Sequence, residues 1–306
     1  MMLLGLILDT LIGWPRGLYN TLGHPVTWIG ALIDRLDAVW NTGTAEQRRR
    51  SGAIATCIVI AATAVPVLIL TLFLPSGPLG ILLGGFLAWP MIAARSLLTH
   101  VAAVATPLSS GDTQAARHAV AQIVGRDPAQ LDAPGIARAS LESLAENTSD
   151  GVIAPLFWGV ILGPPGLWSY KAINTLDSMI GHLTPEHSDF GRFAARVDDV
   201  VNLIPARLSG LLFAAVSGNP KQSLTTMRRD ARQHRSPNAG WPESAMAGAL
   251  GVRLSGPRRY ADRIADEPWL NPDARDPGAQ DIRRGLALYR RAMILTAGLL
   301  AALAVL

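Results

Sequence analysis

Side chains capable of chemistry are concentrated in one stretch of this 306-residue chain, from Glu142 to Arg207. Acids, amides and bases there flank apolar blocks that would otherwise be typical of membrane-buried helix. Burying a charge without a partner costs several kcal/mol, so such groups persist at membrane depth mainly where they pair or take part in chemistry. We therefore expect the active site in this stretch, with the rest of the chain supporting it.

The first group lies in the ENTSD motif that starts at Glu146. Glu146 and Asp150 are four residues apart and would share a helix face, where two carboxylates can hold one Mg²⁺ or divide acid and base roles. Asn147 lies beside them. The alternative is an N-cap, with Thr148, Ser149 or Asp150 starting the next helix.

The second group lies in YKAINTLDSMIGH. This motif places four residues on one helix face with Asp177 close by, namely Lys171, Asn174, Thr175 and Ser178. A lysine in this position suits an anionic phosphate or carboxylate. The alternative is a lysine that snorkels from the end of a membrane span.

The third group lies in RFAARVDDVVNLIPARL, where Asp198 and Asp199 are adjacent. Mg²⁺ usually takes one or two carboxylates and keeps several waters, so we predict that these two aspartates hold Mg²⁺ together with phosphates. Arg196 and Asp199 could instead form a structural ion pair. That alternative explains Asp198, Asn202 and Arg207 less well.

The common nucleotide and hydrolase motifs are absent from the sequence. It contains no GxxxxGK[ST] phosphate loop, no GxGxxG dinucleotide turn, no HExxH zinc helix and no GxSxG elbow. Any nucleotide site must therefore be of an unfamiliar kind.

The composition indicates a polytopic membrane protein. Hydrophobic residues make up 49% of the chain and charged residues 16%, and the mean hydropathy is +0.27, whereas soluble domains usually carry about 25% charged residues. The formal charge of +4 reflects arginines beside apolar spans, and no nucleic-acid motif is present. The single cysteine, Cys57, excludes a disulfide framework and is predicted to be a small buried hydrophobe.

The elements that must position these residues are predicted to be helices. An apolar hairpin over residues 51–74 and 79–94 is flanked by Arg48 to Arg50 and by Arg95. Arginines at the edge of a span mark the cytoplasmic side of the membrane. We therefore expect an all-α, multi-pass integral membrane protein with amphipathic and re-entrant helices and cytoplasmic helical loops.

Two long polar regions are predicted to be helical, water-exposed and cytoplasmic, at about 96–150 and 217–291, by their charge. Asp132 with Pro134 is predicted to start a helix in the first of them. Residues 1–306 are treated as one membrane domain of the bacterial inner membrane, with the active site facing the cytoplasm.

The apolar block from Gly151 to Trp168 is interrupted by Pro155 and by a Gly-Pro-Pro-Gly run that starts at Gly163. If this block crossed the membrane once, the acids before it and the lysine after it would lie on opposite sides. A shared site therefore requires a broken or re-entrant helix, which is tolerated where it lines a protein cavity. We predict re-entry.

Four long blocks carry a family resemblance: ESLAENTSDGVIAPLFW, YKAINTLDSMIGH, FGRFAARVDDVVNLIPARL and SPNAGWPESAMAGALGV. In this order, and with the earlier HPVTWIG and GRD stretches, the chain resembles the CobD/CbiB family of cobalamin biosynthesis over nearly its whole length. Four blocks in register are more specific than any short motif. One departure is Trp14, where the commoner family form has an aspartate in a Gly-Asp-Pro turn.

The resemblance implies an integral membrane adenosylcobinamide-phosphate synthase. Such enzymes use ATP to join the free propionate carboxyl of adenosylcobyric acid to (R)-1-aminopropan-2-ol or its O-2-phosphate. ATP and Mg²⁺ are implied as co-substrate and metal, with no permanently bound cofactor. The implied partners are the corrinoid, the amine, membrane lipid and other corrinoid-pathway membrane enzymes, without nucleic acid.

The residue types fit this reaction, because activating a carboxylate with ATP needs Mg²⁺, carboxylates to hold the metal and cations to hold phosphate. Taken alone, His24 before a proline is more typical of a turn, and Asn238 lies in a predicted loop. The implied catalytic residues are Glu146, Asp150, Lys171, Asp177, Asp198 and Asp199. The implied substrate-binding residues are His24, Asn147, Asn174, Arg196, Asn202, Arg207 and Asn238.

Two other classes of function stay open from the sequence. A secondary transporter would also have broken helices and intramembrane charges, but its expected sign is a pair of repeated halves, and no internal repeat is found. A regulatory membrane protein without catalysis is the second alternative, since the resemblance extends distantly to membrane proteins linked with β-lactamase induction. The dense cluster of acids, amides and bases counts against it.

Overall fold

Helices make up 76% of the computed structural model, which describes residues 1–125, 127–182, 184–259 and 264–305. Strands among these residues are four pieces of two residues each. The predicted all-α class is confirmed. Arg126, part of the GRD stretch, lies outside the described residues.

Several helical runs are long and apolar enough to cross a membrane, which confirms the predicted polytopic character. A bent pair, α10 (Arg192–Val201) with α11 (Leu203–Val216), would add one more if the two helices form a single span. The four runs found in the described residues are Ala45–Leu72, Pro78–Ser109, Ala133–Ile180 and Ala279–Val305.

The chain divides into two compact units, each assembled from two separate segments. Unit 1 comprises Met1–Ala93 and Ala154–Asn202, and unit 2 comprises Ala94–Ile153 and Leu203–Leu306. The sequence prediction of one domain did not separate them. The predicted site residues consequently fall into two sets, one in each unit.

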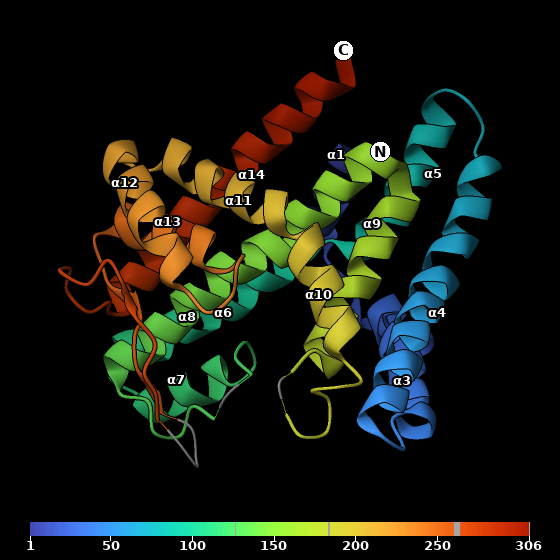
Figure 1. Ribbon diagram of the computed structural model, residues 1–306. Coiled ribbons are helices and arrows are strands. Elements are labelled where there is room, and N and C mark those ends of the chain that lie inside the picture. The colour runs from blue at the N-terminus through green and yellow to red at the C-terminus, as the bar shows by residue number, and fades with distance from the viewer. Residues whose placement is uncertain (126, 183, 260–263, 306) are drawn as a thin grey trace. The chain divides into compact units, whose positions relative to one another are not determined.

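Unit 1 is a helical bundle around a small apolar core that includes Ile33, Val59, Leu176 and Phe190. The helices α3 and α4 lie beside α9 and α10 (Figure 1). A Cβ at Gly52 would overlap the Phe190 carbonyl oxygen, so glycine lets α4 approach the start of α10 closely. The helices of unit 1 are α1 (Met2–Ile12), α2 (Arg16–Leu22), α3 (Pro25–Trp40), α4 (Ala45–Leu72), α5 (Pro78–Ala88), the 3-10 turn η1 (Trp89–Met91), α9 (Ala154–Ile180) and α10.

Helix α4 exposes a strip of large apolar side chains, among them Ile54, Ile58 and Ile69. Cys57 lies on the exposed side of the same helix, so the prediction that it is buried is wrong. Contiguous exposed apolar side chains like these are rare on soluble monomers and are typical of a helix that contacts lipid. The helix starts with a capping box, in which Thr44 Oγ1 accepts the Gln47 backbone N–H over 3.3 Å.

The helix α9 is broken at Gly163, which has φ 70° and ψ −166° and is followed by two prolines. A Cβ at Gly159 would lie 3.3 Å from the Leu167 Cβ, although these residues are eight positions apart. The chain therefore turns back sharply at Gly163, and α9 consists of two arms. The predicted interruption is confirmed, while membrane re-entry of this segment stays a prediction.

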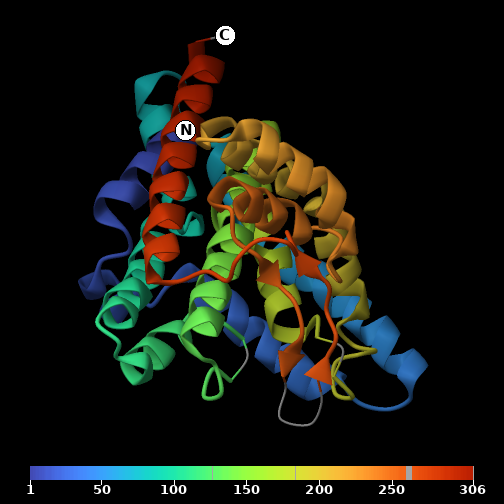
Figure 2. The same ribbon diagram turned by 90° about the vertical axis from the view of Figure 1, so that its left-hand side faces the viewer.

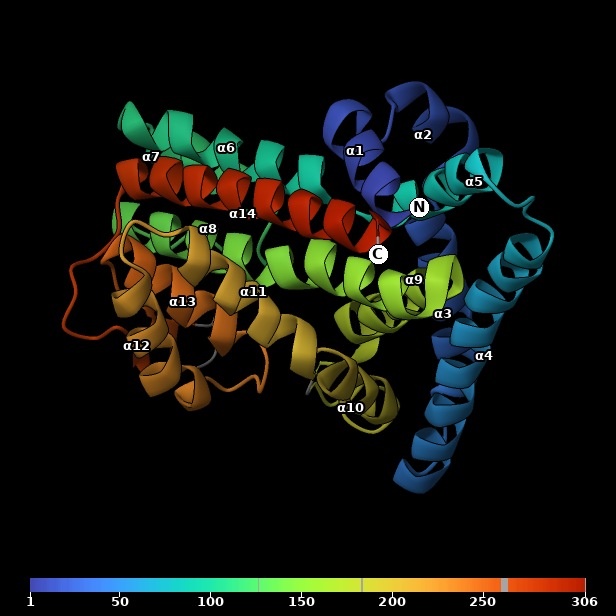
Figure 3. The same cartoon turned by 90° about the horizontal axis from the view of Figure 1, so that it is seen from above.

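Unit 2 has its own core, in which α6, α8, α13 and α14 pack around residues such as Val104, Leu141, Met246 and Tyr289. The helices α6, α8 and α14 run side by side (Figure 3). The helices of unit 2 are α6 (Ala94–Ser109), α7 (Thr113–Val120), α8 (Ala133–Thr148), the π-helical turn η2 (Ser149–Ile153), α11, α12 (Pro220–Asp230), the 3-10 turn η3 (Ala231–Gln233), α13 (Gly240–Leu250) and α14 (Ala279–Val305).

The strands of unit 2 form two antiparallel pairs between α13 and α14, drawn in orange in Figure 2. They are β1 (Leu254–Ser255) with β4 (Trp269–Leu270), and β2 (Arg258–Arg259) with β3 (Ile264–Ala265). Beside β4, the guanidinium groups of Arg138 and Arg253 stack on the Trp269 ring at 4.5 and 4.3 Å from its centroid. Both arginines also bind Asp276.

The first polar region is helical as predicted, but much of α8 is buried rather than water-exposed. Glu142 is 6% exposed, and its carboxylate accepts the Ser255 backbone N–H over 2.7 Å. Asp132 caps α8 through a 2.8 Å bond from the Gly135 backbone N–H, which confirms the predicted helix start. The charged side chain of Glu142 on α8 therefore accepts a hydrogen bond inside unit 2.

Candidate functional site

The second arm of α9 carries the lysine and the amide predicted for the site. The Lys171 Nζ donates a hydrogen bond to the Asn174 Oδ1 over 3.2 Å. Both side chains are half-buried, and Asp177 lies about one turn further along, also half-buried. Ser178 is exposed, and its hydroxyl donates to the Asn174 carbonyl. Lys171 and Asn174 therefore lie together as their spacing predicts, while their role in binding stays a prediction.

Asp198 belongs to a buried hydrogen-bond chain that joins α9 to α10. The Tyr170 hydroxyl donates to the Asn202 Oδ1 over 2.8 Å, and the Asn202 Nδ2 donates to the Asp198 Oδ2 over 3.0 Å. The three residues are 1%, 1% and 8% exposed. Buried, charge-assisted bonds of this kind hold side chains in one orientation. They fix the rotation of α10 about its axis and thus the direction in which Asp199 points.

Asp199 lies on the exposed face of α10 and interacts electrostatically with Asp177. His182, just after the end of α9, acts on Asp177 with the opposite sign. The aspartate of α10 that interacts electrostatically with Asp177 is therefore Asp199, whereas the adjacent Asp198 points into the buried chain. Two neighbouring carboxylates repel each other, and a bound cation relieves that repulsion.

His24 caps the N-terminus of α3, as expected for a turn residue. Its Nδ1 accepts the Val26 backbone N–H over 3.2 Å, and the Thr27 hydroxyl accepts the His24 backbone N–H over 3.3 Å. Burial lowers the pKa of the His24 imidazole, and the nearby Lys171 cation lowers it further. The neutral ring is favoured, and with Nδ1 accepting, its proton lies on Nε2. His24 therefore offers an N–H donor near Lys171.

Arg196 is exposed on α10. Within the part of the chain that the structure describes it forms no ion pair, so the alternative of a structural bridge between Arg196 and Asp199 is wrong. An exposed guanidinium on the same helix as Asp199 can still bind an anionic substrate.

In unit 2, the ENTSD motif spans the end of α8 and the π-helical turn η2. Glu146 and Asn147 are exposed in the last turn of α8, and Asp150 is half-buried in the π turn. The Asn147 Nδ2 donates to the Ser143 carbonyl over 3.0 Å. Because the chain stays helical here, the alternative in which this motif caps a new helix is wrong. Single π turns within helices occur frequently at functional sites.

Arg207 and Asn238 of unit 2 both contact Trp241. The Arg207 guanidinium stacks on the Trp241 ring, 4.3 Å from its centroid. The Asn238 carbonyl accepts the Trp241 backbone N–H over 3.1 Å, and Asn238 is 6% exposed. Arg232 interacts repulsively with Arg207. A guanidinium on an aromatic face with a second cation acting on it suits an anionic or planar ligand.

A comparison with protein families decides where this chain belongs. The family model described as CobD/Cbib protein matches residues 2–289. The chain belongs to the CobD/Cbib family. The resemblance inferred from the four sequence blocks is thus confirmed.

Curated relatives in this family cover nearly the whole chain. Cobalamin biosynthesis protein CobD of Rhodobacter capsulatus is 61% identical over 96% of this chain and 93% of its own length. The proteins of the same name from Brucella anthropi and Rhizobium meliloti are 46% and 43% identical, over 98% and 94% of this chain and 94% and 91% of their own lengths. No solved structure matches the chain significantly.

Trp14 replaces the aspartate of the commoner CobD/Cbib turn, and the structure shows what the indole does there. Its Nε1 donates to the Gly23 carbonyl over 3.1 Å, and its ring meets His24 edge to face at 4.9 Å. A second ring contact, at 5.5 Å, joins it to Trp89. The indole therefore supports the segment that ends at His24.

The sequence analysis did not single out three residues that interact with the candidate site residues. They are His182, which acts on Asp177, and Tyr170 and Trp241, which contact Asn202 and Arg207. Tyr170 directly precedes Lys171, which could have marked it, but its partner Asn202 is 32 positions away. Trp241 lies in the fourth family block, where a ring that stacks on an arginine looks like any other aromatic residue. No local sequence pattern predicts the contact of Tyr170 with Asn202 or that of Trp241 with Arg207.

Proposed function

We propose that this chain is an adenosylcobinamide-phosphate synthase, which uses ATP to form the amide between adenosylcobyric acid and (R)-1-aminopropan-2-ol or its O-2-phosphate. Family membership supports this, because relatives with 61% and 43% identity bear the name cobalamin biosynthesis protein CobD. The observation that carries the proposal is the pair of carboxylates Asp177 and Asp199, with Lys171 on the same arm of α9.

Amide formation from a carboxylate has two chemical requirements. The carboxylate is a poor electrophile and must be activated, which in this reaction uses a phosphoryl group of ATP. The phosphates and the reacting carboxylate are all anionic, so positive charge must hold them close together. A lysine and a metal-binding carboxylate pair meet both requirements.

The donor set of unit 1 fits Mg²⁺, because Asp177 and Asp199 offer the carboxylate oxygens that this ion prefers. These two residues would hold it, with waters and phosphate oxygens as further ligands. When bound, Mg²⁺ supplies charge neutralisation of the phosphates. Asp198, which the sequence also assigned to the metal, would instead orient α10 through Asn202 and Tyr170.

Lys171 would bind a phosphate or the carboxylate that is activated, since a compact ammonium attracts an anion from any direction. Asn174 positions the Lys171 ammonium through their hydrogen bond. The Nε2–H of neutral His24 would donate to the same anion.

We also propose that this site faces the cytoplasm, where ATP is available. The support is the arginine run Arg48 to Arg50 at the start of α4, which the positive-inside rule assigns to that side. The exposed Cys57 must first be replaced by serine, and single cysteines are then labelled from each side of the membrane. Labelling of a cysteine at position 49 from the periplasmic side would overturn this orientation.

The decisive experiment is a direct assay of the purified chain in detergent. It is incubated with adenosylcobyric acid, aminopropanol or its phosphate, ATP and Mg²⁺, and the amide is detected by its mass. Product should require ATP and disappear when EDTA is added. If folded protein forms no amide with either amine, the proposal fails, and movement of a corrinoid across vesicles without product would favour the transporter alternative.

A further inference from the structure

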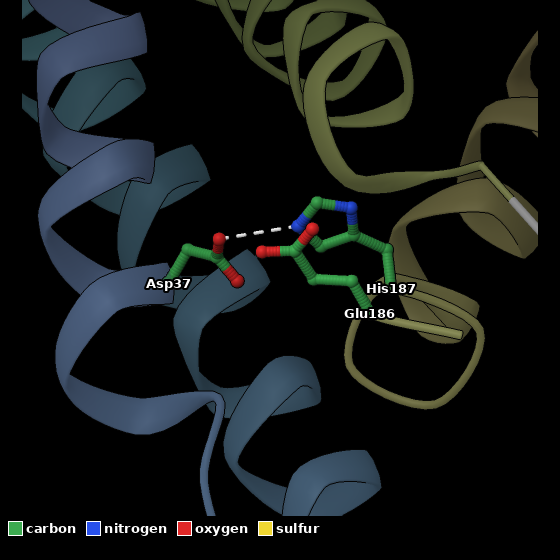
Figure 4. A group of neighbouring side chains, drawn as sticks. All are labelled: Asp37, Glu186 and His187. Carbon is green, nitrogen blue, oxygen red and sulfur yellow. Dashed lines mark hydrogen bonds and ion pairs between the residues drawn. The ribbon is translucent and has the colours of Figure 1, made fainter. Parts of the chain in front are cut away.

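A second set of metal-type ligands lies in unit 1, outside the residues proposed for catalysis. Asp37 is near the end of α3, and Glu186 and His187 lie in the segment between α9 and α10 (Figure 4). One oxygen from each carboxylate and one imidazole nitrogen all lie within 4.8 Å of one another. Asp37 and His187 are half-buried, and Glu186 is exposed. Three donors of two chemical kinds therefore converge from distant parts of the sequence.

The spacing of two of these donors is already that of ligands on one ion. The His187 Nε2 lies 3.1 Å from the Asp37 Oδ2. Donors bound to Zn²⁺ at about 2.0–2.2 Å in a tetrahedral arrangement lie roughly 3.4 Å apart. A small adjustment would exchange the hydrogen bond between these two side chains for two bonds to a metal.

Residues outside the set hold it in place. The Asn41 Nδ2 donates to the Asp37 Oδ1 over 2.9 Å and to the Glu186 carbonyl over 3.0 Å. The Arg48 Nε donates to the Asn41 Oδ1 over 2.7 Å, and a second Arg48 nitrogen donates to the Glu186 carbonyl. Metal-binding carboxylates are typically oriented by such outer hydrogen bonds. The Asp37 Oδ1 is thereby occupied, and the Oδ2 is turned toward His187.

Charge also favours a cation at this position. Asp37 and Glu186 place two negative charges next to a single imidazole. Among the described residues, Arg48 contacts amide and carbonyl oxygens here and not these carboxylates. Like charges at this separation repel, and a divalent ion offsets both of them.

We propose that Asp37, Glu186 and His187 bind a first-row divalent cation, with Zn²⁺ bound in preference to Mg²⁺. Imidazole suits Zn²⁺, whereas Mg²⁺ prefers oxygen ligands and gives up its waters reluctantly. The ion joins the last turn of α3 to the segment that leads into α10, so its role is structural. This inference does not depend on the proposed enzymatic function.

The test uses the full chain, purified in detergent and stripped with EDTA. Zn²⁺, Mn²⁺ or Mg²⁺ is titrated in the absence of any substrate, and bound metal per chain and Tm are measured. We expect about one Zn²⁺ per chain and an increase in Tm that grows with free Zn²⁺ concentration, as for any ligand that binds only the folded state. A Tm increase with Mg²⁺ but not with Zn²⁺ would overturn the assignment.

Four variants locate the ion. His187→Gln and Asp37→Asn should each lower Zn²⁺ affinity at least tenfold, the scale of losing one ligand or its support. Asp189→Asn is the matched control, because Asp189 lies in the same segment but binds Arg49 at 2.7 Å. It should bind Zn²⁺ as the wild type does. If His182→Gln abolishes binding and His187→Gln does not, the ion lies beside Asp177 instead, and the proposal is wrong. Unchanged binding in all four variants would show that Asp37 and His187 form only an ion pair.

Discussion

Two aspartates of this molecule, Asp276 in unit 2 and Asp177 in unit 1, have different electrostatic surroundings. In unit 2, aspartates face arginines, as Asp276 does with Arg138 and Arg253 at 2.8 and 2.7 Å. In unit 1, the Asp177 carboxylate interacts repulsively with another carboxylate, that of Asp199. Further arginine pairs of unit 2 are Arg229 with Asp230, and Arg275 and Arg284 with Asp281.

This difference separates a structural from a functional use of the same side chain. An aspartate between two guanidinium groups is compensated by the fold, and removing it costs stability. Repulsion between two carboxylates destabilises the fold, and a bound cation or a proton relieves that repulsion. The comparison predicts that charge removal at Asp177 or Asp199 affects activity, whereas charge removal at Asp276 affects stability.

The largest effect is expected from Asp177→Asn and Asp199→Asn. Each should lower kcat about 10³-fold, the upper end of the loss seen for single electrostatic contacts in active sites. Tm should stay unchanged or rise, because neutralising one carboxylate removes repulsion. Glu46→Gln is the control, since Glu46 is an exposed acid of unit 1 that pairs with Arg50. Near-normal kcat at limiting Mg²⁺ in both variants would end the functional interpretation of this pair.

Lys171→Ala should have the next largest effect, a loss of about 3 kcal/mol of transition-state stabilisation, or roughly 10²-fold in kcat/KM. Lys171→Arg should keep part of the activity, because a point charge is enough for an anion. Activity is measured per folded molecule across Lys171→Ala, Lys171→Arg and Lys171→Gln. Equal values in all three would mean that Lys171 only snorkels at the end of a span.

Tyr170→Phe tests the buried chain that orients α10. Removing the hydroxyl leaves the Asn202 Oδ1 without that donor, which should cost about 1–2 kcal/mol of stability and lower kcat several-fold by releasing Asp199. Ser169→Ala is the control, because the Ser169 hydroxyl bonds within its own helix, to the Pro165 carbonyl over 2.8 Å. If Tyr170→Phe loses stability but its Mg²⁺ dependence stays that of the wild type, Asp198 does not position Asp199.

The smallest effect concerns Asp276, whose pKa is held at about 2 by hydrogen bonds from Arg253 and then from Arg138. A carboxyl with a lowered folded-state pKa contributes stability above its unfolded value of 3.8 and loses it as the pH falls toward about 2. Because the side chain is 34% exposed, screening reduces the contribution to about 1 kcal/mol. Asp276→Asn should lose this amount at pH 7 and match the wild type near pH 2, with unchanged kcat. Asp273→Asn, an exposed neighbour, serves as the control, and a difference independent of pH would contradict the assignment.

Composition, together with the helix-breaking and helix-capping residues, was sufficient to predict much of the fold. The apolar excess indicated membrane helices, Gly163 with two prolines indicated the break in α9, and Asp132 with Pro134 indicated the start of α8. These signals are local, since a backbone angle or a cap depends on a few neighbouring residues. The burial of α8 was missed because its polar residues, such as Glu142, are satisfied by strands more than a hundred positions later.

The candidate site was predictable in its residue types but not in its pairings. Adjacent Asp198 and Asp199 suggested a joint metal site, yet successive side chains on a helix point about 100° apart. Which one faces Asp177 depends on the rotation of α10, which Tyr170 and Asn202 set. Asp37 and His187 are 150 positions apart, and no spacing rule connects them.

The break at Gly163 affects how many times the chain would cross the membrane. A straight helix over Ala154–Ile180 would count as one crossing and would place every later segment on the opposite face of the bilayer. A chain that turns back midway leaves the parity of the crossings unchanged. With the predicted re-entry of α9, the arginine-rich start of α14, around Arg283, would stay on the side that the positive-inside rule requires. In that predicted arrangement, the turn at Gly163 sets the side of the membrane on which every later segment lies.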